Sequence, residues 1–169
     1  MKDRIFVIDG SSYLYRAYHA MPPLSTSSGQ PTGAVKGVTN MLMNLKKDSE
    51  GSPIIVVFDA KGKTFRNDIY SEYKANRPPM PDELRDQLVP VKSICRAIGF
   101  PLIEIEGVEA DDVIATISKM AKEAKYKCVI SSLDKDLMQL VEDPHTTMMD
   151  TMKHKIFNEE SVFEKFGVK

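Results

Sequence analysis

Three carboxylates lie within four positions of the motif VEADDVIAT, residues 108–116: Glu109, Asp111 and Asp112. Like charges about 4 Å apart repel by roughly 4 kcal/mol at the effective dielectric near a protein surface, so such a cluster needs solvent or a cation between its members. The residues that follow have the apolar spacing of a helix, and acids in a first helical turn complement the helix dipole. Helix capping therefore explains one or two of these acids, whereas a bound cation would explain all three.

Further acids stand where predicted strands end. The apolar runs RIFVI and IIVVF are followed by Asp9 and Asp59, and CVISSL is followed by Asp134 and Asp136. Because the carboxyl ends of parallel strands line one edge of a sheet, we expect these acids to meet the start of the VEADD helix there. An all-oxygen set suits Mg²⁺ or Mn²⁺, and without metal some of the acids should have raised pKa values. The candidate metal ligands are Asp9, Asp59, Glu109, Asp111, Asp112, Asp134 and Asp136.

A basic and aromatic segment leaves the predicted sheet directly after Asp59. It contains five cations, Lys61, Lys63, Arg66, Lys74 and Arg77, against only the acids Asp68 and Glu72. Cations bind phosphates, and tyrosine rings stack on unpaired bases. The spacing of the segment predicts one helix face that overhangs the acids, formed by Arg66, Tyr70, Tyr73, Lys74 and Arg77. A solvated basic helix with core tyrosines has the same pattern.

The predicted strands and helices, which would position these acids and cations, alternate along the chain. Strands are predicted at 4–9, 53–59, 101–107 and 127–134, with an edge pair at 146–151 and 155–157. Helices are predicted after 10, at 34–48, at 81–100, after 109 and, capped by Asn158, at the C-terminal end. This order predicts one α/β domain over residues 1–169, with an open, mostly parallel twisted sheet and helices on both faces.

Two details of these helices follow from single residues. Ser11 or Ser12 is expected to cap the helix after the first strand. Pro90 predicts a kink or a break inside the helix at 81–100, because proline lacks the backbone N–H of a helix interior. That helix should stop at Gly99.

The composition of the 169 residues, 42% hydrophobic and 28% charged, is that of an ordinary globular domain. We find no signal peptide and no apolar stretch of membrane-spanning length. Cys95 and Cys128 lie in apolar surroundings, which is typical of reduced, buried thiols in a cytoplasmic protein. No Cys/His pair has zinc-binding spacing, and the isolated histidines are given no chemical role: His19, His145 and His154.

Five motifs, in this order, cover most of the chain: FVIDGSSYLYRAYHA, PTGAVKGVTNML, VVFDAKGKTFRNDIYSEYKANRPPMPDEL, GVEADDVIAT and SSLDKDLMQLV. With them the sequence resembles the N-terminal 5′-nuclease domain of bacterial DNA polymerase I, within the superfamily of flap endonucleases and bacteriophage 5′-exonucleases. The resemblance implies a PIN-like, Rossmann-like fold and a two-metal 5′→3′ nuclease. It also implies action on DNA with a 5′ flap, nick or gap and on RNA primers.

The resemblance assigns roles to individual residues. The seven acids fall on the metal site, and Tyr73, Lys74 and Arg77 fall on the basic and aromatic helix that meets the scissile phosphate. Arg16 and Arg66 are implied as further phosphate contacts, beside the basic and aromatic candidates Lys61, Lys63 and Tyr70. The implied protein is a cytoplasmic, nucleoid-associated monomer with a covalently linked polymerase domain and no membrane contact.

Two departures from the family pattern matter. The family has glycine directly before the acid that matches Asp134, whereas this chain has Leu133. This difference leaves the conformation of the turn, and the exact position of Asp134, undecided by the sequence. The family also continues with two more aspartates of the second metal site and a helix–hairpin–helix element that grips duplex DNA. We therefore expect the chain to be a fragment with an incomplete second metal position and weak activity alone.

Two other functions fit parts of the pattern. One is a non-catalytic nucleic-acid-binding module whose acids only cap helices. The other is a single-strand ribonuclease on the related, smaller nuclease fold, against which the long basic segment after Asp59 argues.

Overall fold

The computed structural model describes residues 3–150, 152–153 and 155–167. Within this part of the chain, six strands form one sheet in the order β3-β2-β1-β4-β5-β6. Their bounds are β1 (Arg4–Asp9), β2 (Ile54–Val57), β3 (Leu102–Ile103), β4 (Lys127–Ser131), β5 (Thr146–Asp150) and β6 (Lys155–Phe157). Neighbouring strands are parallel except for the antiparallel pair β5 and β6 at one edge. The mostly parallel sheet and its edge pair are therefore confirmed.

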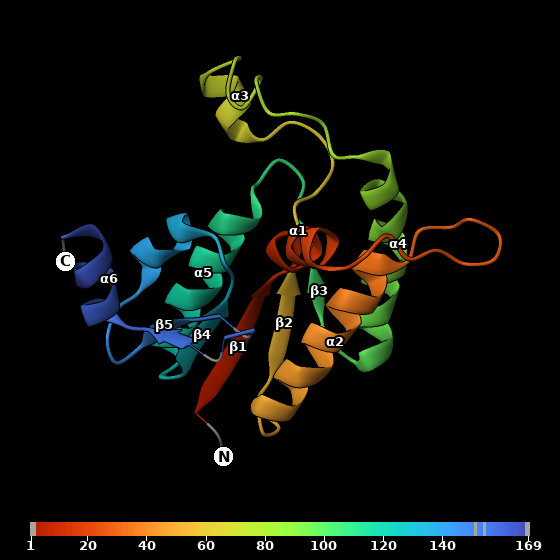
Figure 1. Ribbon diagram of the computed structural model, residues 1–169. Coiled ribbons are helices and arrows are strands. Elements are labelled where there is room, and N and C mark those ends of the chain that lie inside the picture. Colours follow the sequence, from red (N-terminus) through yellow and green to blue (C-terminus); the bar gives the residue numbers. More distant parts are fainter. Residues whose placement is uncertain (1–2, 151, 154, 168–169) are drawn as a thin grey trace.

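Helices cover both faces of this sheet (Figure 1). They are α1 (Gly10–Ala20), α2 (Gly33–Asp48), α3 (Phe65–Ile69), α4 (Asp82–Ile98), α5 (Ala110–Glu123), the 3₁₀ helix η1 (Lys135–Leu140) and α6 (Glu159–Phe166). Successive strand residues point to opposite faces, so Phe6 and Ile8 join the core under α1, α2 and α4, and Val7 joins the core under α5. The predicted α/β architecture is confirmed.

The junction between β1 and α1 differs from the prediction. Asp9, rather than Ser11 or Ser12, caps α1, and its Oδ1 accepts a hydrogen bond from the Ser12 backbone N–H at 3.0 Å. The helix begins directly at Gly10. A Cβ at this position would lie 2.5 Å from the buried Phe58 ring, so only glycine fits there.

Gly10→Ala should lower the free energy of unfolding by about 1–3 kcal/mol, the usual cost of overpacking a core, because the Phe58 ring is buried and has little room to move. Thermal unfolding measures this loss. In a Phe58→Leu background the same substitution should cost less, since the clash is relieved. Equal costs in both backgrounds would show that the ring is not what excludes a side chain at position 10.

The structure also defines the bounds of two other predicted elements. The helix α4 runs through Pro90 without a break and ends at Gly99, whose φ is 92°. Pro90 removes the hydrogen bond to the carbonyl of Asp86, which is exposed, so water can take its place. The third strand is shorter than its apolar run, since only Leu102–Ile103 pairs with β2. In the described part of the chain, no helix combines the length and apolar character that a membrane crossing requires.

Candidate nuclease site

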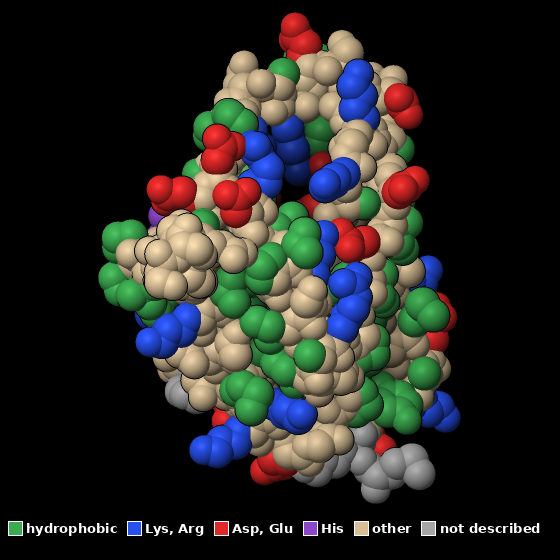
Figure 2. Space-filling view, turned by 90° about the vertical axis from the view of Figure 1, so that its right-hand side faces the viewer, with side chains coloured by type: hydrophobic (Ala, Val, Ile, Leu, Met, Phe, Trp, Pro, Cys, Tyr) green, Lys and Arg blue, Asp and Glu red, His purple; other side chains and the backbone are tan. Residues whose placement is uncertain are grey.

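A cleft of about 1220 Å³ opens at the edge of the sheet where the parallel strands end. Its roof is the segment between β2 and α4, residues 60–80, which we call the arch; it forms the lobe with α3 in Figure 1. Figure 2 shows a hollow below this lobe with Lys and Arg side chains around it. The predicted site residues that line the cleft are Asp9, Asp59, Glu109, Asp111, Asp134, Asp136, Arg16, Lys61, Tyr73, Lys74 and Arg77. Four others lie outside its lining: Lys63, Arg66, Tyr70 and Asp112.

Several acids on the cleft floor already hold hydrogen bonds. Asp9 is buried, and its second oxygen accepts from Ser132 Oγ at 2.7 Å. Asp59 accepts from the Ala110 backbone N–H at 2.8 Å, which ties the end of β2 to the start of α5. Asp134 accepts from the Asp136 backbone N–H at 3.0 Å and so caps η1. Each of these acids therefore fixes local structure as well as facing the cleft.

Asp111 differs from these three acids, because no hydrogen bond to its carboxylate is found among the described residues. Burial, together with the charges of Asp9, Asp134 and Asp59, raises the pKa of Asp111 to about 6. Burial also raises the pKa of Asp9, against the hydrogen bonds from Ser132 and Ser12. The floor thus has an excess of negative charge that the chain itself does not neutralise.

This excess predicts a pH dependence of stability for the metal-free protein. Between pH 4 and 6 the folded chain keeps a proton on Asp111 that the unfolded chain releases, so the free energy of unfolding should fall as pH rises through that range. Melting temperatures in a chelating buffer at pH 4–7 measure the effect. The profile of Asp111→Asn should be flatter, and parallel profiles for the two proteins would contradict this electrostatic picture.

The arch is not the single helix that its spacing predicted. After α3 ends at Ile69 the chain continues as turns through Arg77. The Asn67 side-chain amide donates to the Tyr73 carbonyl at 3.3 Å, which folds the chain back on α3. Lys74 has φ 58°, in the left-handed region that disfavours a residue with a side chain, and such strain often marks a functional position.

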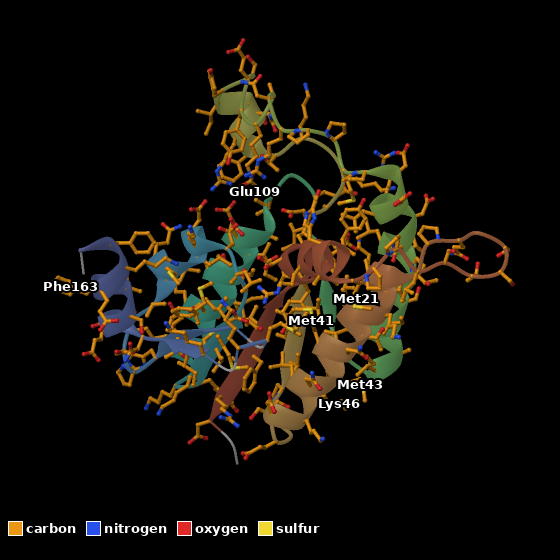
Figure 3. All side chains as sticks on the ribbon, viewed as in Figure 1. Met21, Met41, Met43, Lys46, Glu109 and Phe163 are labelled. Atoms are coloured by element: carbon orange, nitrogen blue, oxygen red, sulfur yellow. The ribbon has the colours of Figure 1, made fainter. Side chains whose placement is uncertain are left out.

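Cations of the arch contact the acids at the start of α5. The Lys74 ammonium donates to Glu109 Oε1 at 2.7 Å, and the Tyr73 hydroxyl donates to Glu109 Oε2 at 3.3 Å. Burial alone would lower the pKa of Lys74. The hydrogen bond to Glu109 and the charge of Glu109 outweigh this effect, so the pKa of Lys74 is raised. Figure 3 places Glu109 between the start of α5 and the arch lobe. Arg66 forms a two-pronged contact with Asp112, which holds the pKa of that carboxyl below its usual range.

Sequence reasoning missed part of the cleft wall. Ser11, Tyr15 and His19 line the cleft beside Arg16, and the rings of Tyr15 and His19 stack with centroids 6.4 Å apart. The four-residue spacing of these rings in the helix that follows Asp9 was the available signal. The backbone of His145 closes a turn with Glu142 and accepts from the Cys128 N–H, and His154 lies outside the described residues.

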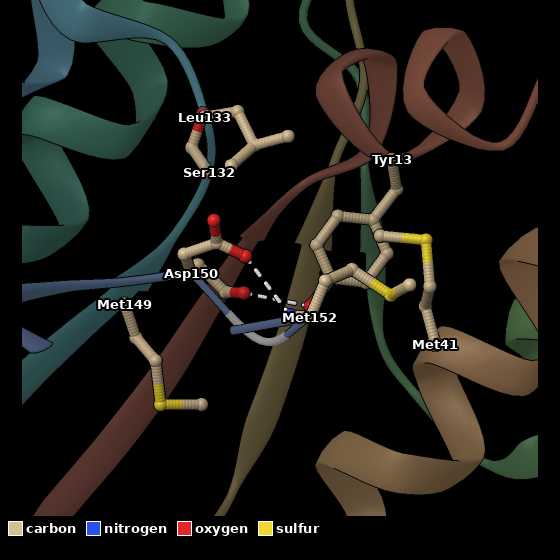
Figure 4. Close-up of a pocket in the computed structure, with 8 residues that line it drawn as sticks. Tyr13, Met41, Ser132, Leu133, Met149, Asp150 and Met152 are labelled. Atoms are coloured by element: carbon tan, nitrogen blue, oxygen red, sulfur yellow. Dashed lines mark hydrogen bonds between the residues drawn. The ribbon is translucent and has the colours of Figure 1, made fainter. Parts of the chain in front are cut away.

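Leu133 does not distort the turn that precedes Asp134. It is not among the described non-glycine residues with positive φ, and its N–H donates to Ser12 Oγ at 3.0 Å. A small cavity of about 10 Å³ lies beside it, between Tyr13, Met41 and Asp150 (Figure 4). That volume admits about one water molecule and no substrate.

The donor set of the cleft fits a hard divalent cation. Among the described residues no group of three or more His, Cys, Asp and Glu side chains is arranged to hold a metal ion as it stands. Several of the acids hold internal bonds instead: Lys74 donates to Glu109, and backbone and hydroxyl donors bind Asp9 and Asp59. Oxygen ligands, excess negative charge and Asp111 without an internal donor fit a divalent ion that exchanges for some of these bonds.

Comparison with known proteins agrees with this geometry. A family model described as the N-terminal, resolvase-like domain of 5′–3′ exonuclease matches residues 4–167. DNA polymerase I of Pseudomonas aeruginosa is 56% identical over 164 residues, which cover 97% of this chain and 18% of the polymerase. A 5′–3′ exonuclease of Aquifex aeolicus is 44% identical over 164 residues, covering 97% of this chain and 56% of the exonuclease. The chain thus spans little more than half of the length of the exonuclease and less than a fifth of the length of the polymerase.

A solved structure has the same fold at lower sequence similarity. The flap endonuclease of bacteriophage T5, in complex with DNA and metal ions, superimposes with a TM-score of 0.75 and 22% identity over 98% of this chain and 61% of that one. This likeness supports the PIN-like fold. Together with the match of the family model over nearly the whole chain, it means that the chain belongs to the family of N-terminal, resolvase-like domains of 5′–3′ exonucleases.

Proposed function

We propose that this domain is the catalytic part of a divalent-metal-dependent, structure-specific 5′→3′ nuclease that hydrolyses phosphodiester bonds of DNA. The observation that carries the proposal is the cleft itself, which has six acids on its floor and Arg16, Lys61, Lys74 and Arg77 on its walls. The relatives named as 5′–3′ exonuclease and DNA polymerase I support the same activity. Its substrates would be 5′ flaps, nicks, gaps and RNA primers, and a linked polymerase would be its partner.

Residues of this chain would have distinct roles in the reaction. When bound, two divalent ions support the attacking water and the leaving oxygen of an in-line displacement. Asp9, Asp59, Glu109, Asp111, Asp134 and Asp136 would hold the ions, and Mg²⁺ or Mn²⁺ suits these oxygen ligands. Lys74 and Arg77 would bind the reacting phosphate from the roof, and Arg16 would bind a neighbouring phosphate from α1.

In this mechanism Glu109 would bind either the arch or a metal ion. In the structure it accepts bonds from both Lys74 and Tyr73, and a metal ion would compete for the same oxygens. Lys74 released from Glu109 is the group best placed to turn toward a phosphate in the cleft. The arch thereby links occupation of the acidic floor to the presentation of a cation above it.

A second candidate is the non-catalytic nucleic-acid-binding module. It is favoured by the bonds of Asp9, Asp59 and Asp134 to backbone N–H groups, which are the bonds of capping and turn residues. Asp111 discriminates between the two functions, because it caps nothing and still carries a raised pKa.

Titration calorimetry with Mn²⁺ tests the proposal. The nuclease should give binding heat that Asp111→Asn removes, and the same preparation should cleave a 5′-flap DNA only when the metal is present. A binding module should give no such heat. Cleavage of single-stranded RNA in preference to flap DNA would instead support a ribonuclease on the same fold.

A further inference from the structure

Asp112 and Arg66 form a pair on the outer side of the cleft wall. Arg66 Nη2 donates to Asp112 Oδ1 at 2.8 Å, and Nη1 contacts Oδ2, so both carboxylate oxygens are used. Neither residue lines the cleft, although Asp111 next to Asp112 does. Neighbouring helical residues point about 100° apart, so the two adjacent acids of α5 face different surroundings.

The pair joins α3, within the arch, to the start of α5. The backbone N–H of Phe65 donates to the Gly107 carbonyl at 2.9 Å beside it. The Arg66 guanidinium also lies over the Phe65 ring, with its central carbon 4.7 Å from the ring centroid. A fork of two parallel bonds fixes orientation as well as distance, which a lysine in the place of Arg66 does not reproduce.

The second ion pair of the arch is of another kind. Lys74 and Glu109 both line the cleft, and their contact is a single bond within reach of any cation that enters. Arg66 Nη1 also lies 3.4 Å from Glu109 Oε2, farther than its contacts with Asp112. A divalent ion at Glu109 competes directly with the Lys74 ammonium. The same ion meets no free oxygen on Asp112, because Arg66 holds both.

We propose that Asp112 is not a metal ligand but the anchor of the arch, which through Arg66 keeps α3 docked on the start of α5 while Lys74 exchanges from Glu109 to the substrate. The role of this anchor in the reaction rests on the proposed nuclease function, but the contact between Arg66 and Asp112 does not depend on that function. Asp112 and Arg66 are then positioning residues that act on the reaction through Lys74.

Limited trypsin digestion of the metal-free chain tests the anchor, because the arch carries the trypsin sites Lys61, Lys63, Arg66 and Lys74. Both side chains are about a third exposed, so loss of the pair should raise the open population, and hence cleavage in the arch, about two- to tenfold. Asp112→Asn and Arg66→Lys should both show this increase, and the latter keeps the charge and the trypsin site. The double variant should be no worse than either single one.

Asp82→Asn is the matched control, since it removes one acid from an exposed Arg85 pair on α4 and should leave arch digestion unchanged. Mn²⁺ calorimetry gives the second measurement: Asp112→Asn should retain the binding heat that Asp111→Asn loses. Loss of Mn²⁺ binding in Asp112→Asn, or unchanged digestion in Arg66→Lys, would overturn the proposal. If the wild-type chain gives no Mn²⁺ heat, the proposed function fails, while the digestion result still decides whether Asp112 anchors the arch.

Discussion

Asp111→Asn will reduce cleavage of a 5′-flap DNA by at least about 10²-fold, the loss expected when one charged group that supports a transition state is removed. Asp111 lies in the field of Asp9, Asp134 and Asp59, and its carboxylate accepts no hydrogen bond from the described residues. Its carboxylate therefore has no structural partner among these residues, while its raised pKa indicates an unmet need for a cation. Single-turnover cleavage at saturating enzyme measures the effect on the chemical step.

The same variant should keep its fold, and the metal-free protein should become more stable. The raised pKa of Asp111, about 6, shows that its charged form is disfavoured in the folded state, so a neutral amide of the same shape removes that repulsion. We expect a gain of about 1–2 kcal/mol, or a few degrees in melting temperature, once solvent screening is allowed for. Asp86→Asn, an exposed acid on α4, is the control and should change neither cleavage nor stability. Near-normal cleavage by Asp111→Asn would refute the metal assignment.

The fold was predictable because strands and helices alternate with clear boundaries. Each buried strand ends on or beside an acid, so the convergence of Asp9, Asp59 and Asp134 at one edge followed from parallel topology alone. The helix start at Ala110 followed from the acids of the first turn, and Asn158 caps α6 as its sequence position indicates. Local pattern and overall topology agree at these positions, so sequence was sufficient.

The arch was not predictable, because its conformation depends on contacts that periodicity does not encode. The spacing of Tyr70, Tyr73 and Arg77 indicated a continuous helix, but the chain turns after Ile69, where the Asn67 amide bonds to the Tyr73 carbonyl. The contacts of Arg66 with Asp112 and of Lys74 with Glu109 then hold these turns against α5, 46 and 35 residues away in sequence. Tertiary contacts of this range override a local helical pattern.

Side-chain direction was the other limit. Sequence placed Asp111 and Asp112 in one cluster, but the turn of the helix directs one acid into the cleft and the other to Arg66. Likewise His19 looks isolated in the sequence, yet it lies in the cleft wall because α1 continues directly from Asp9. The first residue of a helix decides which face of the helix meets the site. At α1 this start depends on the space beside Phe58 at Gly10.

Lys74→Ala is expected to have opposite effects on metal binding and on turnover. Lys74 Nζ lies 2.7 Å from Glu109 Oε1, and its raised pKa keeps it charged at neutral pH. Without the ammonium, the remaining cation near Glu109 is Arg66, 3.4 Å from Oε2, so competition for the carboxylate weakens and Mn²⁺ should bind more tightly. Turnover should nevertheless fall by about 10²–10³-fold, because charge that grows on the reacting phosphate loses the cation above it.

DNA binding separates this role from that of an ordinary phosphate contact. Removing one phosphate contact should lower the salt dependence of binding by about one unit of slope and weaken binding far less than turnover. Lys63→Ala is the matched control, because Lys63 is an exposed cation of the same arch that does not line the cleft, and its turnover should stay close to that of the wild type. If Lys74→Ala lost binding and turnover equally, Lys74 would hold the substrate without assisting the reaction. If Mn²⁺ affinity did not rise, the Lys74–Glu109 contact would not compete with the metal, and the exchange that links the arch to the acidic floor would have to be abandoned.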